Sequence, residues 1–177
     1  MSESACVALG SNLGERESHV AAALVALTRH AEVSGLVGSS LWETAPVGGP
    51  AGQGAYLNAA ARFETTLSPR VLLDLLLELE RVHGRERSVP DAPRTLDLDL
   101  LLYGDRVIRE EGLTVPHPRL HLRPFVLAPL REVAADLLHP ELGVSVEGLA
   151  GRLEGTDAWG TDDVTRYPAP TQSSHPR

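Results

Sequence analysis

The chain has 177 residues and a mass of 19.0 kDa, which fits one compact domain with a short extension. Its one cysteine, Cys6, excludes an internal disulfide and any zinc site built from several thiolates. The net charge of -8 and the aromatic content of 4% argue against a nucleic-acid binder that relies on basic patches and stacked bases. All sixteen basic residues are arginines, so a phosphate-binding loop with lysine and a Schiff-base lysine are both excluded.

The N-terminal residues carry neither a basic leader nor a long apolar core, so we expect no signal peptide. No run of about 18 apolar residues occurs, and we therefore expect no contact with a membrane. These features predict a cytoplasmic protein, which we expect to be a monomer and to bind no nucleic acid.

Strand and helix patterns alternate along the first part of the chain. Residues 5–9 predict a buried strand that ends in a Gly-Ser-Asn turn. Apolar residues at helical spacing predict a helix from near residue 15 to residue 30. Residues 35–42 predict a second strand, and the glycine- and proline-rich residues 46–54 predict a loop. Alternating apolar and polar residues predict a third strand over 57–64.

A second helix and a fourth strand complete the main pattern. Ser68 and Pro69 are typical of a helix start, and the apolar spacing continues to Val82 before Gly84. A polar loop follows, and residues 96–103 predict the fourth strand. The order β-α-β-β-α-β predicts an α+β fold of the ferredoxin-like kind, with an antiparallel sheet and both helices packed on one face.

The remainder of the chain is predicted to be an appended C-terminal region. Short strands and helices are expected over residues 105–151. From residue 154 onward the chain is rich in Gly, Pro, Thr, Ser and Asp and poor in apolar residues. We therefore predict a domain over 1–153 and a disordered tail over 154–177.

Two aspartates in the fourth strand are the first candidates for a chemical role. Side chains alternate along a strand, so Asp97 and Asp99 should share one face with their Cα atoms ~6.5–7 Å apart. The leucines between and around them should pack on the opposite face, under the helices. Two carboxylates this close repel each other by ~2–3 kcal/mol, which divalent cations such as Mg²⁺ would relieve. The alternative is an ordinary polar face exposed to solvent. The leucines expected on the face opposite the two aspartates are Leu96, Leu98, Leu100 and Leu102.

Arginines gather just before this strand. A guanidinium binds phosphate through two parallel hydrogen bonds, and arginines on a loop could close over a charged ligand. The alternative is a solvated loop in which they pair with the nearby Glu78, Glu80 and Glu86. The arginines are Arg81, Arg85, Arg87 and Arg94, with Arg123 further along the chain.

Several isolated residues have both a plain and a functional interpretation. The turn before the first helix could present backbone amides to an anion, but a simple tight turn explains it as well. His117 lies between prolines, which argues against a helical zinc site with His121 and leaves a contact to a nucleotide open. The aromatic rings of Tyr56 and Phe125 suit either a core or a ligand platform, and Asn58 could bond a heterocycle or water.

Three classes of protein share the predicted topology. A domain that senses small molecules has no reason to combine two aspartates with several arginines. An RNA-binding module would carry aromatic residues on its central strands and a basic face, and the chain has neither. A metal-dependent enzyme of phosphoryl transfer fits the pattern best.

Specific motifs strengthen this interpretation. The segments PRTLDLDLLLYG at 93–104 and LTVPHPRL at 113–120 occur in this order with ALGSNLG at 8–14, WETAPVG at 42–48 and RPFVLAPL at 123–130. Over roughly residues 5–145 the chain resembles the 6-hydroxymethyl-7,8-dihydropterin pyrophosphokinases of folate biosynthesis. The resemblance implies transfer of the β,γ-diphosphate of ATP to the hydroxymethyl oxygen of the pterin, with release of AMP.

The resemblance also assigns roles to individual residues. It implies two Mg²⁺ ions on Asp97 and Asp99, and catalysis by these two residues together with Arg85 and Arg87. The residues that it places on ATP are Arg85, Arg87, Arg94, His117 and Arg123. The residues that it places on the pterin are Tyr56 and Phe125, which sandwich the ring, and Thr44, Val47 and Asn58 at its rim. Glu80 corresponds to a position near the hydroxymethyl group.

Overall fold

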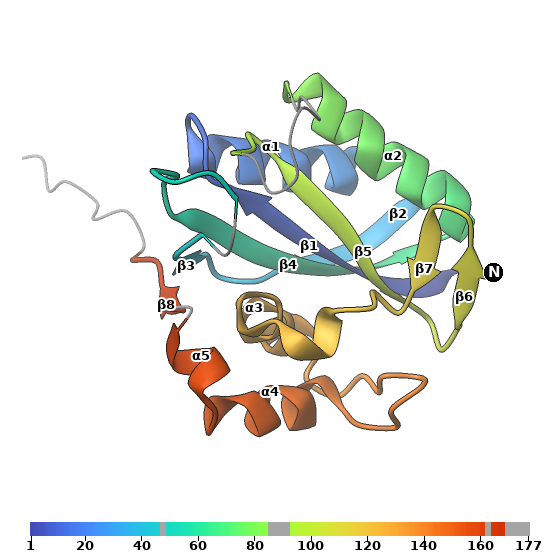
Figure 1. Cartoon of the computed structure of the whole chain (residues 1–177). Coiled ribbons are helices and arrows are strands. Elements are labelled where there is room, and N and C mark those ends of the chain that lie inside the picture. Colours follow the sequence, from blue (N-terminus) through green and yellow to red (C-terminus); the bar gives the residue numbers. More distant parts are fainter. Residues whose placement is uncertain (47–48, 85–92, 162–163, 169–177) are drawn as a thin grey trace, which may run out of the picture.

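The computed structural model describes residues 1–46, 49–84, 93–161 and 164–168. One antiparallel sheet lies between two layers of helices, with α1 and α2 on one face and α3 and α4 on the other (Figure 1). The strands are β1 (Glu3–Ser11), β2 (Val33–Gly38), β3 (Trp42–Thr44), β4 (Tyr56–Thr65), β5 (Asp97–Tyr103), β6 (Ile108–Glu110), β7 (Leu113–Val115) and β8 (Thr165–Arg166). The helices are α1 (Arg16–Arg29), α2 (Pro69–Val82), α3 (Pro124–Ala134), α4 (Val146–Glu154) and α5 (Asp157–Thr161), with a 3-10 turn at Leu120–Leu122.

The strand order in the main sheet is β5-β1-β4-β3-β8, and β2 also pairs with β4. The single strand predicted over 35–42 is therefore two strands, β2 and β3, which lie along the same side of β4. Ser39 lies between them and keeps contact with β4, because its backbone N–H donates to Ala60 (2.8 Å) and its hydroxyl accepts from the Ala60 N–H (2.9 Å). The prediction of one continuous strand over 35–42 was therefore wrong.

Local sequence signals explain the second helix. Pro69 is its first residue, and the Ser68 hydroxyl accepts a hydrogen bond from the Val71 N–H at 3.4 Å. Gly84 follows the helix with a φ of +79°, a conformation that favours glycine. The buried residues of α2 include Leu72 and Leu76, which face the sheet. The expected boundaries of this helix are confirmed, and its apolar face packs as expected except at Val82, which is 65% exposed.

The two faces of the sheet carry separate hydrophobic clusters. Val7, Leu9 and Phe63 belong to the cluster under α1 and α2, whereas Cys6 and Ala60 belong to the cluster with α3 and α4.

A β-bulge interrupts the alternation in β5. The pairing of β1 with β5 shifts between Cys6 and Val7, so that Cys6 is opposite Leu102 and Val7 is opposite Leu100. As a result Leu101 and Leu102 both join the α3 cluster. The prediction that Leu102 packs under the first two helices was wrong, because the extra residue of the bulge changes which face the following side chains meet.

The C-terminal region covers the second face of the sheet. The hairpin β6–β7 and the helices α3 and α4 lie where short strands and helices were predicted. The division at residue 154 stays a prediction, but part of the range beyond it packs on the domain, since α5 follows α4 and β8 pairs with β3. Among the residues described, no helix has the length and apolar character needed to cross a membrane.

Candidate active site

On the second face of the sheet, small residues of β1 form a floor between the acidic side chains of β5 and an amide side chain of β4. Asp97 is opposite Gly10 on β1, and Gly10 is opposite Asn58 on β4. In the next row, Asp99 is opposite Ala8, which is in turn opposite Ala60. Since the middle strand carries only a glycine and an alanine here, the acids of β5 and the amide of β4 face each other over small residues.

Arginines flank the two aspartates. A nitrogen of the Arg94 guanidinium lies 3.0 Å from an Asp97 carboxylate oxygen, and a nitrogen of Arg123 lies 4.0 Å from Asp99. Burial alone would lower the pKa of Arg94, but nearby negative groups, Asp97 foremost, raise it. The positively charged side chains that a polyphosphate site requires are therefore already next to the acid pair.

His117 belongs to the same cluster. Burial is the main reason that its pKa falls to about 4, Arg123 lowers it further, and Asp97 opposes the shift. Its Nδ1 atom accepts a hydrogen bond from the Arg119 N–H at 3.1 Å, which leaves the Nε2 atom as the N–H donor of a neutral ring. The structure thus brings together five residues that the sequence singled out: Arg94, Asp97, Asp99, His117 and Arg123.

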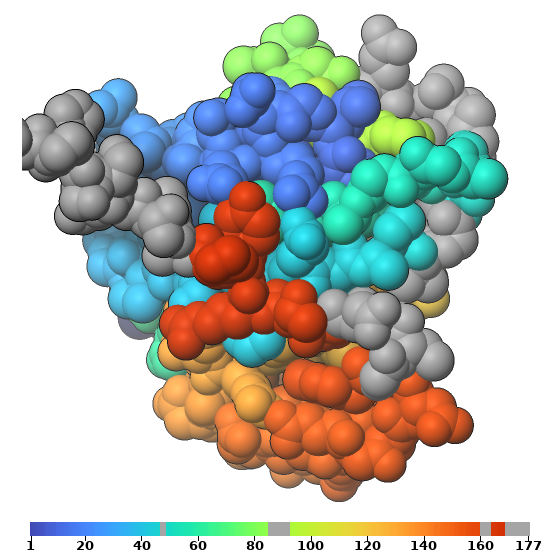
Figure 2. Space-filling model, turned by 90° about the vertical axis from the view of Figure 1, so that its left-hand side faces the viewer, coloured from blue at the N-terminus to red at the C-terminus, as the bar shows by residue number. Residues whose placement is uncertain are grey.

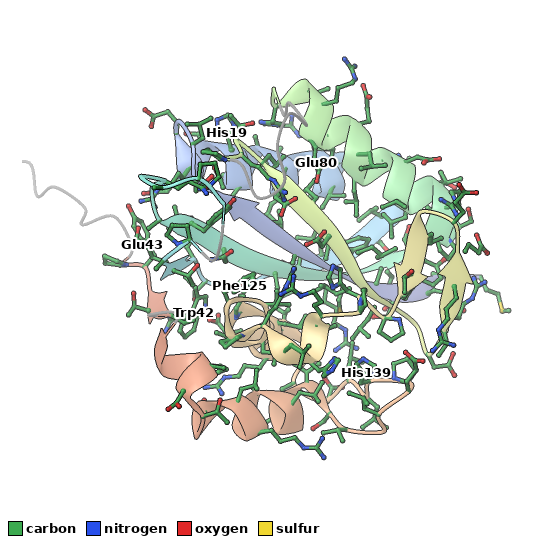
Figure 3. The ribbon with its side chains drawn as sticks, viewed as in Figure 1. His19, Trp42, Glu43, Glu80, Phe125 and His139 are labelled. Atoms are coloured by element: carbon green, nitrogen blue, oxygen red, sulfur yellow. The ribbon has the colours of Figure 1, made fainter. Side chains whose placement is uncertain are left out.

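The residues expected to hold a heterocycle lie at the other side of the floor. Asn58 and Thr44 are both buried and bond to each other, the Asn58 Nδ2 atom donating to the Thr44 hydroxyl at 2.9 Å. Thr44 pairs with Tyr56 across the two strands. Phe125 comes from the start of α3, at the edge of the space between that helix and the sheet (Figure 3), and the Arg123 guanidinium lies 5.5 Å from its ring centre. Val47, Arg85 and Arg87 lie outside the described residues.

Asn12 is a residue whose role the sequence reasoning missed. Its side chain is buried and joins three segments around the site. The Oδ1 atom accepts from the Arg94 N–H at 2.7 Å, and the Nδ2 atom donates to the Gln53 side chain (3.2 Å) and to the Gly54 carbonyl (3.3 Å). The Gly-Ser-Asn turn was visible in the sequence, but the bonds that Asn12 makes to distant segments, through its side chain and through its backbone N–H to the Arg94 carbonyl (3.0 Å), were not.

The surroundings of Glu80 and of Cys6 indicate a structural role for each residue. The Glu80 carboxylate is 2% exposed, points from α2 toward β5 (Figure 3), and accepts a hydrogen bond from the Leu98 N–H at 2.8 Å. It therefore satisfies a backbone donor of β5, which is an edge strand of the sheet.

Burial raises the pKa of the Cys6 thiol to about 12, which excludes it as a nucleophile.

The carboxylate oxygens of the acid pair suit a hard cation whose coordination shell is completed by a bound ligand. Among the residues described, no group of three or more His, Cys, Asp or Glu side chains is placed to hold a metal ion. The carboxylates of Asp97 and Asp99, with side chains 23% and 34% exposed, would supply oxygen ligands that leave positions open for water or phosphate.

Comparison with known proteins defines the class. The family model for 7,8-dihydro-6-hydroxymethylpterin-pyrophosphokinase (HPPK) matches residues 6–135. This match includes the acid pair, its arginines, His117, Tyr56, Asn58 and Phe125. The chain therefore belongs to the HPPK family.

Individual relatives agree with the family match. The chain is similar to the 2-amino-4-hydroxy-6-hydroxymethyldihydropteridine pyrophosphokinase of Haemophilus influenzae, with 43% identity over 143 residues, which are 81% of this chain and 89% of the relative. The enzyme of the same name from Bacillus subtilis is 46% identical over 137 residues, which are 77% of this chain and 81% of the relative.

Solved structures support the fold alone. A Plasmodium falciparum HPPK-DHPS structure matches with a TM-score of 0.70 at 12% identity, covering 94% of this chain and 48% of that one. Another structure of that protein matches with a TM-score of 0.68 at 13% identity, covering 94% and 46%. The chain thus spans less than half of these longer proteins.

Proposed function

We propose that this chain carries out the reaction named by its family: it transfers the pyrophosphoryl group of ATP to the hydroxymethyl group of 6-hydroxymethyl-7,8-dihydropterin and releases AMP. The chain is a pyrophosphokinase of folate biosynthesis. The observation that carries the assignment of the site is the acid pair of β5 with arginines on both sides, facing Asn58 across the floor of the sheet.

ATP is the co-substrate, and Mg²⁺ is the cation that its phosphates and two carboxylates together favour. We infer that Asp97 and Asp99 hold two Mg²⁺ ions. When bound, these ions would neutralise charge on the phosphates and lower the pKa of the pterin alcohol. Two observations support this inference: the two carboxylates share one face of the sheet, and both are partly exposed, so a cation bound to them could also bind phosphate or water.

The arginines and the histidine provide the remaining contacts to ATP. Arg94 and Arg123 are already beside the acid pair, so each can bind phosphate oxygens through charge-assisted hydrogen bonds without crossing the site. The neutral His117 ring can donate its Nε2 N–H to the nucleotide. Arg85 and Arg87 remain proposed as phosphate-binding and catalytic residues on the basis of the family resemblance.

The pterin is proposed to bind over β3 and β4. Tyr56 and Phe125 would contact the two faces of the ring, while Asn58 and Thr44 would bond its edge; Val47 stays in this set by resemblance. The Asn58–Thr44 hydrogen bond supports this role, because it fixes the rotamer of each side chain before a ligand arrives. Since the chain has no lysine, and its cysteine is buried, catalysis rests on positioning and charge neutralisation.

Some broader features also belong to the proposal. The strand order, with β2 and β3 taken as one interrupted strand, supports the ferredoxin-like arrangement for residues 3–103. We further propose that the catalytic domain covers residues 1–153 and that the enzyme works as a monomer in the cytoplasm.

The direct test measures AMP formation from ATP and Mg²⁺, with and without 6-hydroxymethyl-7,8-dihydropterin. We expect AMP to appear only when the pterin is present and to match the amount of pterin diphosphate formed. ADP as the nucleotide product, or AMP release that does not depend on the pterin, would contradict the proposed reaction.

A further inference from the structure

Arg16 occupies a position that its own helix disfavours. It is the first residue of α1, where the helix dipole opposes a positive charge, and the preceding Glu15 makes no side-chain capping bond. Its side chain is nevertheless held at 26% exposure by a carboxylate and a backbone carbonyl. One guanidinium nitrogen lies 2.9 Å from a Glu43 carboxylate oxygen, and the other donates to the Ala55 carbonyl at 2.8 Å.

These two partners stand at the two ends of the segment that joins β3 to β4. Glu43 is next to Thr44, and Ala55 is next to Tyr56. Thr44 and Tyr56 are opposite each other at the last step of the β3–β4 ladder. The Arg16 guanidinium therefore joins the two strands just where their own hydrogen bonding ends.

The C-terminal strand packs beside the same arginine. β8 pairs with β3, with Thr165 opposite Glu43, and the Tyr167 N–H donates to the Leu41 carbonyl at 2.9 Å. The Tyr167 ring centre then lies 5.9 Å from the guanidinium carbon of Arg16. Figure 2 shows this part of the tail crossing the β3 region and reaching α1.

We propose that Arg16 is a positioning residue for the pterin half of the site and that Tyr167 acts through it by covering its guanidinium. This inference rests on the proposed function. Glu43 and Ala55 anchor the arginine, and the arginine in turn holds the ends of β3 and β4, and with them Thr44 and Tyr56, in place. The acid pair and its arginines lie on or beside β5, on the other side of β1, so this device should act on the pterin and not on ATP.

Arg16→Gln in the full chain tests the idea, because glutamine keeps one amide donor and loses the ion pair. We expect the KM for the pterin to rise about tenfold, which corresponds to ~1.4 kcal/mol, while kcat and the KM for ATP change by less than about twofold. Arg16→Lys keeps the charge and should give a smaller rise. Hydrogen exchange of the amides of residues 53–58 should become faster in Arg16→Gln.

Arg70→Gln is the matched control. Arg70 also pairs with a glutamate, Glu110 (3.2 Å), and donates to a backbone carbonyl, that of Glu111 (2.8 Å), but on α2 near the β6–β7 hairpin. Arg70→Gln should leave the KM for the pterin and the KM for ATP unchanged. An effect of Arg16→Gln on ATP and pterin alike, or an unchanged KM for the pterin, would overturn the inference.

Tyr167→Ala tests the contribution of the tail. We expect a rise of about threefold in the KM for the pterin, and no further rise when this change is added to Arg16→Gln, since Tyr167 acts through the arginine. Additive effects would overturn that part of the inference. Absence of pterin-dependent AMP formation in the unaltered chain would instead overturn the proposed function, and this inference with it.

Discussion

Asp97 and Asp99 differ from an isolated acid pair because each has an arginine beside it. From the sequence alone, their mutual repulsion predicts that removing one charge leaves the fold intact or slightly more stable. The Arg94–Asp97 ion pair, at 3.0 Å, removes the reason for that expectation, because it offsets the repulsion. The effect of these residues should therefore appear in catalysis and not in stability.

Asp97→Asn and Asp99→Asn should each lower kcat by roughly 100-fold or more, equivalent to at least ~2.7 kcal/mol of transition-state stabilisation. The free energy of unfolding should change by less than ~1 kcal/mol, because both side chains are partly exposed. Steady-state AMP formation and urea unfolding measure the two effects. Asp74→Asn, on the exposed side of α2, is the control. A variant of either site residue with turnover within a few fold of normal would rule out the metal assignment.

His117 predicts a pH dependence of stability. Its pKa is about 4 in the folded chain, against an ordinary value of 6.5. As the pH falls through this window, the unfolded chain binds a proton that the folded chain does not, so the free energy of unfolding decreases. The stability contribution of the neutral ring is complete above 6.5 and is lost toward 4.

His117→Asn should make the fall in stability across this window shallower, since asparagine does not titrate. Urea unfolding in EDTA at several pH values between about 7 and about 4.5 measures it. His30→Asn, at the end of α1, serves as the comparison variant. Equal slopes for the unaltered chain and for His117→Asn would show that this ring does not carry the effect.

At the scale of elements, α2 supports the edge of the sheet through one buried carboxylate. Glu80→Ala would leave the Leu98 N–H without its acceptor and should destabilise the fold by about 1–3 kcal/mol. Glu80→Gln keeps a carbonyl oxygen and should lose less. Urea unfolding compares them, with Glu78→Ala, an exposed change on the same helix, expected to have little effect. Equal losses for Glu80→Ala and Glu80→Gln would argue against this hydrogen bond as the cause.

Periodicity predicts the elements well where their pattern is regular. The start and end of α2 follow from Ser68 and Gly84, and the shared face of Asp97 and Asp99 follows from simple alternation. It fails where the backbone departs from regularity. The bulge that turns Leu102 toward α3 depends on the pairing with β1, and a single strand pattern contains no information about its partner.

At the scale of the whole molecule, ligand binding should stabilise the fold only when metal and nucleotide are both present. In the proposed site a cation on the acid pair would keep coordination positions for phosphate, so Mg²⁺ and a non-hydrolysable ATP analogue should raise Tm together much more than either does alone. At about 100 times the dissociation constant the gain would be ~2.7 kcal/mol.

A thermal-shift series measures this coupling. EDTA in the absence of nucleotide should leave Tm unchanged, because the described part of the chain holds no cluster of side chains that a structural metal would need. A nucleotide response that is the same with and without Mg²⁺ would contradict the coupling.

Contacts between distant segments are what the sequence could not predict. Asn12 meets Arg94 across 82 positions of the chain, and Arg16 meets Ala55 across 39. The unfavourable place of an arginine at a helix start was a visible clue to the second of these. The pairing of β8 with β3 had no clue, because a tail rich in glycine and proline carries no periodic pattern.

The small residues of β1 have a consequence for which acceptor molecules can react. Gly10 and Ala8 contribute almost no side-chain bulk, so β4, where the pterin is proposed to bind, and β5, which carries the acid pair, are separated by two interstrand intervals, ~10 Å. Backbone hydrogen bonding keeps that interval constant. In the proposed site, this main-chain geometry would select the length of the arm that carries the reacting oxygen, and point mutations in the binding side chains would leave that selection unchanged.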